Sequence, residues 1–271
     1  MTEVGVSQRV VSRDGTPIAF SRTGRGPAVI LVDGAFGTRQ FGPNEPLAPV
    51  LAEHFTVYTY DRRGRGDSGD TQPYAVEREI EDLDAIVEAA GGSAHVYGIS
   101  SGAALALAAA NSGVPIRRLA LFEAPFVVDD TRPPVPEGYL EELNELIAAG
   151  RRGPAVKLFM RKAVGVPGIF VAMMQIMPAW SKLKGVAHTV PYDAAILGDT
   201  GLGRPLPADR WASVTVPTLV MDGGKSPLWM RNAMRALADT LPDARHRTLE
   251  KQMHVVKPKA IGPVLVEFFS D

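Results

Sequence analysis

Hydrophobic residues follow two kinds of pattern along this chain, and the change between the patterns divides it into segments. Short continuous apolar runs, typical of buried strands, alternate with longer stretches in which apolar residues recur at helical spacing. The predicted strands are 10–13, 16–21, 28–32, 55–60, 94–97, 119–122, 218–221 and 245–249. The predicted helices are 46–53, 76–90, 103–110, 228–240 and 258–269. This alternation predicts an α/β fold, with a mostly parallel sheet and helices on both of its faces.

The alternation stops in the middle of the chain. Residues 126–210 contain no strand pattern, and prolines divide this segment into short helical stretches. The strand and helix alternation then returns and continues to the C-terminus. We therefore predict an α/β core made of residues 1–125 and 211–271, interrupted by an inserted helical cap, or lid, at 126–210.

The turn after the predicted strand 94–97 carries the strongest chemical signal. It reads Gly98-Ile99-Ser100-Ser101-Gly102 and leads into an alanine-rich helix. A strand, a Gly-x-Ser-x-Gly turn and a helix in this order are typical of a nucleophile elbow, which exposes the serine hydroxyl at the strand end. The N-terminus of the following helix favours negative charge at the same place. Ser100 is therefore the predicted nucleophile.

A serine hydroxyl needs a base before it can attack a carbonyl at neutral pH. His254 is the best candidate, because it follows the last predicted strand and precedes the last helix. A loop in that position comes to the carboxyl edge of a parallel sheet, where Ser100 is also expected. The other histidines are interpreted as packed or surface residues: His54, His95, His188 and His246.

Two carboxylates compete for the role of orienting that imidazole and stabilising its charged form. Asp222 comes directly off the strand 218–221, and Ser226 occupies the position a few residues later where an acid is also expected. Glu123 follows the strand 119–122 and has apolar neighbours, a costly setting for a charge without a partner. Both carboxylates therefore remain candidates for the acid, and Glu123 is favoured.

Negative charge that develops on the substrate carbonyl oxygen needs backbone donors held in place. One predicted donor is the N–H of Ser101, at the start of the helix after the nucleophile. The other is the N–H of Ala35, in the glycine-containing loop 34–37 that follows the strand 28–32. These two residues form the predicted oxyanion hole.

Composition and charge exclude several other classes of protein. The formal net charge is −1, so no overall field favours nucleic acid or an anionic membrane, and neither is an expected partner. The chain has no cysteine, and no His and carboxylate spacing typical of a metal site is found. Residues 64–69 fit a dinucleotide-binding pattern, but no helix follows them directly, and no cofactor is expected. The N-terminus shows no signal-peptide pattern, so we expect a cytoplasmic protein, either a monomer or a homodimer.

The chain resembles the α/β-hydrolase superfamily, in particular its lidded serine hydrolases and small hydrolases of actinobacterial type. The resemblance covers nearly the whole chain and rests on the elbow 98–102, on Asp61-Arg62-Arg63-Gly64-Arg65-Gly66-Asp67-Ser68, and on the late His254. It implies an eight-stranded sheet with a helical cap. It also implies cleavage of esters, lactones, thioesters or activated C–C bonds.

Two departures from the family pattern are visible. Many relatives have His-Gly after the first central strand, whereas this chain has Asp33-Gly34. The usual Gly-x-x-Asp after the seventh strand reads Gly223-Gly224-Lys225-Ser226 here, so the acid is displaced. Some relatives place the acid after the sixth strand, which favours Glu123.

The predicted lid is rich in methionine and aromatic residues, most of which are expected to pack it onto the core. Met173, Met177 and Trp180 are predicted to line an apolar substrate pocket, because thioether side chains adapt to irregular partners. The sequence thus predicts a cofactor-free serine hydrolase acting on a hydrophobic carboxylic ester or lactone, with an acyl or polyketide-like substrate. The alternatives are a biosynthetic cyclase, a C–C hydrolase or an acyl transferase with the same triad, or a ligand-binding protein with vestigial catalysis.

Overall fold

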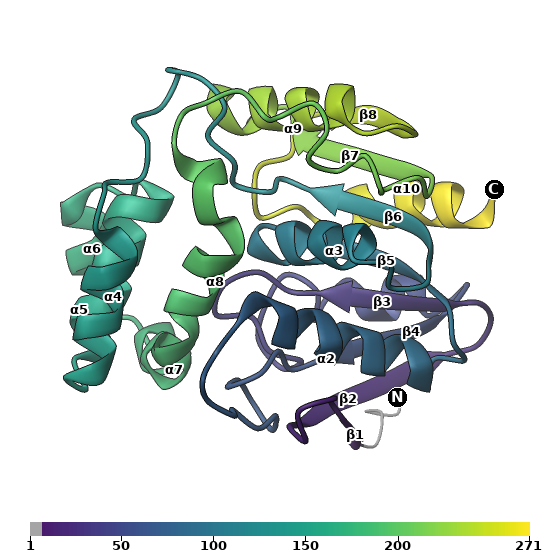
Figure 1. Ribbon diagram of the computed structural model, residues 1–271, viewed down its shortest axis with the longest axis horizontal. Helices are drawn as coiled ribbons and strands as arrows, with labels where there is room; N and C mark the ends of the chain where they lie inside the picture. The colour runs from purple at the N-terminus through teal and green to yellow at the C-terminus, as the bar shows by residue number, and fades with distance from the viewer. Residues whose placement is uncertain (1–6) are drawn as a thin grey trace.

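A twisted sheet forms the centre of the computed structural model, which describes residues 7–271. In this part of the chain the sheet has eight strands in the order β1-β2-β4-β3-β5-β6-β7-β8 (Figure 1). The strands are β1 Gln8–Val11, β2 Pro17–Gly24, β3 Ala28–Val32, β4 Thr56–Tyr60, β5 Ala94–Ile99, β6 Ile116–Phe122, β7 Thr218–Gly223 and β8 Ala244–Leu249. Strand β2 runs antiparallel to β1 and β4, and the other pairs are parallel. The predicted α/β fold is confirmed.

Helices cover both faces of the sheet and bury an apolar cluster on each side. The core helices are α1 Ala48–Leu51, α2 Val76–Ala89, α3 Ser101–Asn111, α9 Leu228–Thr240 and α10 Pro258–Ser270. Side chains of α2, α3 and α9 pack on one face, with Leu83, Leu105 and Met234 fully buried. Helices α1 and α10 pack on the other face.

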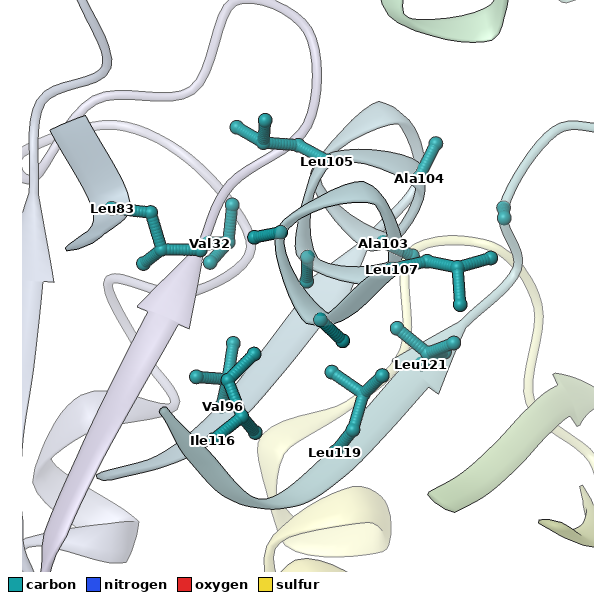
Figure 2. Packing of buried hydrophobic residues seen from close by; sticks show 14 of the residues in the cluster. Val32, Leu83, Val96, Ala103, Ala104, Leu105, Leu107, Ile116, Leu119 and Leu121 are labelled. Atoms are coloured by element: carbon teal, nitrogen blue, oxygen red, sulfur yellow. The ribbon is translucent and has the colours of Figure 1, made fainter. Parts of the chain in front are cut away.

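Helix α3 lies close against the sheet because its side chains are small. Figure 2 shows α3 lying over Val96 and Leu121 of the strands, and Ala103, Leu105 and Leu107 of the helix belong to the same buried cluster. Residues 103–104, 106 and 108–110 are alanines. Close helix-to-strand packing brings the first turn of α3 to the carboxyl ends of β3 and β5, where the candidate nucleophile lies.

The segment between β6 and β7 holds the helices that the sequence predicted as a cap. They are α4 Tyr139–Ala148, α5 Arg152–Phe159, α6 Gly168–Met174, α7 Ala179–Val186 and α8 Val190–Leu197, called here the inserted helices. They lie beyond the carboxyl ends of the parallel strands, with α8 nearest to the sheet (Figure 1). An apolar cluster of their own includes Tyr139, Leu143 and Leu183, and Phe36 of the core joins it.

The residues at the two boundaries of the predicted insertion pack on the core. Phe126 and Trp211 are both buried in the cluster beside α3, and their rings stack with centroids 5.7 Å apart. The chain thus leaves and re-enters the core at two points that lie side by side.

Residues 1–6 lie outside the described residues, and the N-terminal pattern on which the signal-peptide prediction rested falls among them. In the described remainder, no helix has both the length and the apolar character that crossing a bilayer requires.

Candidate active site

The turn around Ser100 has the strained geometry of an exposed nucleophile. Ser100 has φ 58° and ψ −131°, a conformation that residues with side chains rarely adopt. Glycines flank it because space is lacking: a Cβ on Gly98 would lie 2.5 Å from the Gly102 oxygen, and one on Gly102 would lie 2.4 Å from the Val32 oxygen. The Ser100 N–H donates to the Phe122 oxygen at 2.9 Å, which ties the turn to β6.

A cavity of about 720 Å³ opens at this turn. Ser100 and His254 both line it, so the structure brings the predicted nucleophile and the predicted base to one space. Its walls are mainly apolar and come from the loop after β3, the start of α9, the loop after β8 and the inserted segment. Such a mostly apolar cavity with a few convergent polar groups is typical of a small-molecule site.

Glu123 is the carboxylate that meets His254. Its Oε2 lies 2.8 Å from His254 Nδ1, and its Oε1 accepts the Gly223 N–H at 2.7 Å. Glu123 is fully buried and directly follows β6, with φ 48°. This left-handed backbone turns the chain sharply at the strand end and directs the side chain towards the loop that carries His254.

Asp222 meets a different histidine. Its Oδ2 lies 2.5 Å from Nε2 of His246, which is on β8. Asp222 lies within β7, and alternate residues of a strand point to opposite faces. It therefore shares the face of Val220, whose register partner on β8 is His246 itself. The structure does not bring Asp222 to His254.

The loop after β3 approaches Ser100, the candidate nucleophile, closely enough to supply an oxyanion donor. A Cβ on Gly34 would lie 2.8 Å from Ser100 Cβ, so this position accepts only glycine. Ala35 and Ser101 both line the cavity. The N–H of Ser101 is at the first residue of α3, where no intrahelical acceptor exists. The N–H of Ala35 has no hydrogen-bond acceptor within residues 7–271.

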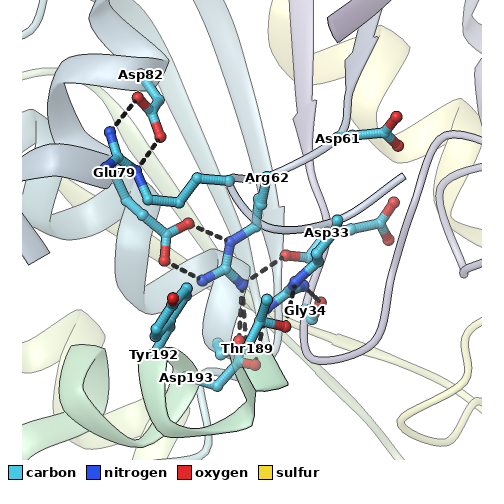
Figure 3. A network of polar contacts seen from close by, with 12 residues as sticks. Asp33, Gly34, Asp61, Arg62, Glu79, Asp82, Thr189, Tyr192 and Asp193 are labelled. Carbon is cyan, nitrogen blue, oxygen red and sulfur yellow. Dashed lines mark hydrogen bonds and ion pairs between the residues drawn. The ribbon is translucent and has the colours of Figure 1, made fainter. Parts of the chain in front are cut away.

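Two buried arginines from the run 61–68 hold that loop in place (Figure 3). Arg65 Nη1 donates to the Gly34 oxygen at 2.7 Å, and Arg62 Nη1 lies 3.3 Å from the Asp33 oxygen. Arg62 also forms a bidentate pair with Glu79 on α2, at 2.7 and 2.8 Å. Bidentate guanidinium–carboxylate pairs fix geometry well, so these arginines set the position of the loop carbonyls.

Asp193, on helix α8, connects the inserted helices to this arrangement. Its Oδ1 accepts from Arg62 at 2.7 Å and from the Ser101 hydroxyl at 2.7 Å, and its Oδ2 accepts from Arg65 at 2.8 Å. Burial raises the pKa of the Asp193 carboxyl, but Arg65 and Arg62 outweigh this effect and hold the pKa below its ordinary value. The ionised Asp193 therefore links α8 directly to Ser101 and, through Arg62 and Arg65, to the loop that carries Ala35.

The predicted substrate-binding residues of the lid are not brought to the cavity. Met173 and Met177 are more than half exposed, at 56% and 54%, and Trp180 is buried in the cluster of the inserted helices. The residues from Phe159 to Leu197 that line the cavity are instead Phe159, Met160, Ala163, Val164, Asp193 and Leu197, and Arg132 and Val135 join them from the loop before α4. Residues Met160–Val164 form a π-helical turn directly after α5, and this turn supplies three of these side chains.

Sequence reasoning missed Asp193 and Arg132 as cavity residues. Asp193 lies in sequence 131 residues from Arg62, so no local pattern marks it. Arg132 lies in a proline-rich stretch without periodicity, and it also lines the cavity. No group of three or more metal-ligating side chains is found within residues 7–271.

The fold is that of an α/β hydrolase, and comparison with known proteins agrees. A family model described as the alpha/beta hydrolase family matches residues 29–258. The chain belongs to this family. It is 61% identical to an alpha/beta hydrolase of known structure from Sphaerobacter thermophilus, with a TM-score of 0.90, and the match covers 97% of this chain and 100% of the other.

Two more distant structures share the fold. The enol-lactonase from Burkholderia xenovorans is 21% identical with a TM-score of 0.72, and the match covers 97% of this chain and 100% of that one. The 2-hydroxy-6-oxo-6-phenylhexa-2,4-dienoate hydrolase from a Rhodococcus species is 21% identical with a TM-score of 0.70, over 100% of both chains. At this identity the likeness is evidence of the fold alone.

Proposed function

We propose that the protein is a serine hydrolase that cleaves a largely apolar carboxylic ester or lactone through an acyl-enzyme intermediate. One observation carries the proposal: the strained Ser100 turn and the Glu123–His254 pair face one cavity. A strained backbone persists where the surrounding structure over-determines it, and such positions concentrate at reactive sites.

In the proposed mechanism, Ser100 Oγ attacks the substrate carbonyl carbon while His254 Nε2 takes the hydroxyl proton. Glu123 accepts from His254 Nδ1–H and so fixes the tautomer and stabilises the imidazolium. The N–H groups of Ser101 and Ala35 donate to the tetrahedral oxyanion. His254 then protonates the leaving alkoxide, and a water molecule, activated by the same base, releases the acid and restores Ser100.

A cyclase, a C–C hydrolase or an acyl transferase could use the same groups, and the product separates these from ester hydrolysis. A carboxylate nucleophile, which epoxide hydrolysis and dehalogenation require on this fold, is absent at position 100. The two distant structures are a lactonase and a hydrolase of a phenyl-substituted dienoate, which makes lactones and phenyl esters sensible first substrates.

The test is labelling with a fluorophosphonate, which reacts with activated serines, followed by peptide mass spectrometry. We expect label on Ser100 of the wild type and none on the Ser100→Ala variant. Hydrolysis of 4-nitrophenyl esters and aryl lactones should then follow the same pattern. A folded wild type that neither takes the label nor hydrolyses any of these substrates would overturn the proposal in favour of a binding protein.

A further inference from the structure

Arg132, in the loop between β6 and α4, lines the catalytic cavity without a carboxylate partner. Its guanidinium lies over the ring of Trp229, with Cζ 4.4 Å from the ring centroid. Its Nη2 donates to the backbone oxygens of Lys162 and Ala163 at 3.0 and 2.6 Å. Its Nε and Nη1 make no hydrogen bond within residues 7–271, and no salt bridge there includes it.

The other arginines that contact this site, unlike Arg132, have carboxylate partners. Arg62 and Arg65 are buried and each pairs with the carboxylate of Asp193. Arg132 is partly buried, and even partial burial of a cation without a counter-charge is costly; burial lowers the pKa of its guanidinium. The Trp229 ring and two carbonyl oxygens are neutral partners that orient the guanidinium and leave its charge uncompensated.

The environment of Arg132 is built to hold the guanidinium in place. Trp229, at the start of α9, is itself 9% exposed and lines the cavity. Lys162 and Ala163 belong to the π-helical turn that forms part of the cavity wall. The site therefore holds a cationic group in a fixed orientation beside an apolar space, with Nε and Nη1 free to donate in the described part of the chain, which favours a single charge-assisted hydrogen bond to an anion such as a carboxylate.

We propose that Arg132 is an anion-binding residue of the cavity, and that the substrate is an apolar ester or lactone that carries a free carboxylate. The second half of this statement rests on the proposed function, whereas binding of a carboxylate does not require turnover. Lys257 also lines the cavity, but its side chain is exposed to solvent, so its ammonium remains hydrated.

Binding is tested first, in the Ser100→Ala background, where no turnover occurs. Calorimetric titration with 4-phenylbutyrate and with its neutral counterpart 4-phenylbutanamide compares an anion and an amide of nearly equal size. We expect the carboxylate to bind about tenfold or more tightly, as one charge-assisted pair predicts. Adding Arg132→Gln should remove this preference, while Lys257→Gln and the exposed Arg161→Gln should keep it.

Turnover is tested next with 4-nitrophenyl monoesters of dicarboxylic acids, from succinate to suberate, against the same esters with the free acid methylated. We expect kcat/KM to favour one carboxylate-bearing length by about tenfold or more. Arg132→Gln should lower that value by about tenfold and should change kcat/KM of the methylated series much less, so that the preference is lost. Melting curves show whether the variant is folded.

The outcomes separate the two proposals. Equal binding of acid and amide, no binding of the acid, or loss of the preference in Lys257→Gln instead of Arg132→Gln would each overturn the role of Arg132. Hydrolysis of both ester series without discrimination would overturn the substrate class and leave ester hydrolysis standing. Carboxylate binding through Arg132 without hydrolysis of any ester would support the site and count against the proposed function.

Discussion

Two histidine–carboxylate pairs lie at neighbouring strand ends of this sheet, and only one of them faces the cavity. Glu123 and His254 meet at 2.8 Å, and Asp222 and His246 meet at 2.5 Å. Both carboxylates are fully buried, and both histidine side chains are partly exposed, at 34% and 24%. By residue type and distance alone, either pair could serve as the acid and base of a hydrolase.

Position in the fold makes the difference. His254 comes from the loop after β8 and lines the cavity with Ser100, whereas His246 lies within β8 and pairs across to β7. A pair inside the sheet connects two strands, and a pair on a loop can reach a substrate. Under the proposed function, the Glu123–His254 pair would take part in the chemistry and the Asp222–His246 pair would serve the fold.

The largest difference in kcat is expected between variants of the two histidines. We expect His254→Ala to lower kcat by about 10⁴-fold or more, as the loss of a triad base does elsewhere. His246→Ala should leave kcat within about threefold and lower the melting temperature by a few degrees. Steady-state hydrolysis of one 4-nitrophenyl ester, with melting curves of both variants, checks this. A comparable loss of kcat in both variants would erase the distinction between the pairs.

Variants of the two acids should also differ in kcat, with the larger loss at Glu123, but the difference should be smaller than between the two histidine variants. Glu123→Gln keeps the size of the side chain but cannot hold His254 in the productive tautomer, so kcat should fall by about 10²- to 10⁴-fold. Asp222→Asn should change kcat by no more than about threefold, because its partner His246 does not touch the cavity. Fluorophosphonate labelling rates give an independent readout of Ser100 activation. Faster labelling of Glu123→Gln than of Asp222→Asn would reverse the assignment.

The sequence predicted the parts of this site that depend on local geometry. A Gly-x-Ser-x-Gly turn needs small flanking residues, so Ser100 is visible as a pattern, and His254 is visible from its place between a strand and a helix. The choice between Glu123 and Asp222 depends on the face of β7 that Asp222 occupies and on one left-handed residue at 123. Neither feature can be predicted from a short stretch of sequence.

The inserted helices were harder to predict. Apolar spacing identifies Met173 and Met177 as hydrophobic, but it does not say which face of which short helix turns inward. The π-helical turn Met160–Val164 directs other side chains to the cavity. Asp193 was invisible because its partners Arg62 and Arg65 lie more than a hundred residues away along the chain.

A third, smaller effect should separate two buried aspartates that pair with arginines of the same run. Asp193 pairs with Arg62 and Arg65 beside the cavity. Asp82 pairs with Arg63 at a distance of 2.7 Å, and this pair does not line the cavity. Breaking a buried pair by removing one charge costs about 3–5 kcal/mol, so Asp193→Asn and Asp82→Asn should both lower the melting temperature. Only Asp193→Asn should also lower kcat, by about 10- to 100-fold, because it loosens an oxyanion donor.

The measurement is kcat at a temperature where both variants remain folded. An unchanged KM with a reduced kcat in Asp193→Asn would mark a role in the transition state. If Asp82→Asn lost as much kcat as Asp193→Asn, the effect would reflect general loosening of the core, and Asp193 would be structural only.

The smallest expected effect is a change of stability with pH, and it concerns a third buried carboxylate at the same sheet edge. Within residues 7–271 this carboxylate pairs with neither a histidine nor an arginine side chain. Asp33 follows β3, and its Oδ1 has no hydrogen-bond partner there. Burial raises the pKa of Asp33 to about 7, against the lowering effects of the Asn44 N–H and of Arg65 and Arg62. The folded protein therefore keeps a proton on Asp33 at pH values where the unfolded chain has lost it.

The sign of the pH effect follows from this difference. Between the ordinary value of 3.8 and about 7, the folded state binds more protons than the unfolded state. The free energy of unfolding therefore falls as the pH rises, by at most about 1.4 kcal/mol per pH unit for one such group. Asp33→Asn removes this term, so its melting temperature relative to the wild type should rise steadily from pH 5 to pH 7 and then level off.

Asp14 provides the matched control, because its pKa is shifted the other way, to about 2, where hydrogen bonds from Thr16 and Arg63 outweigh the raising effect of burial. A lowered pKa contributes stability that is fully present above 3.8 and is lost only as the pH falls towards 2. The difference between Asp14→Asn and the wild type should therefore be constant from pH 5 to pH 8. A constant difference for Asp33→Asn as well would mean that Asp33 is ionised throughout.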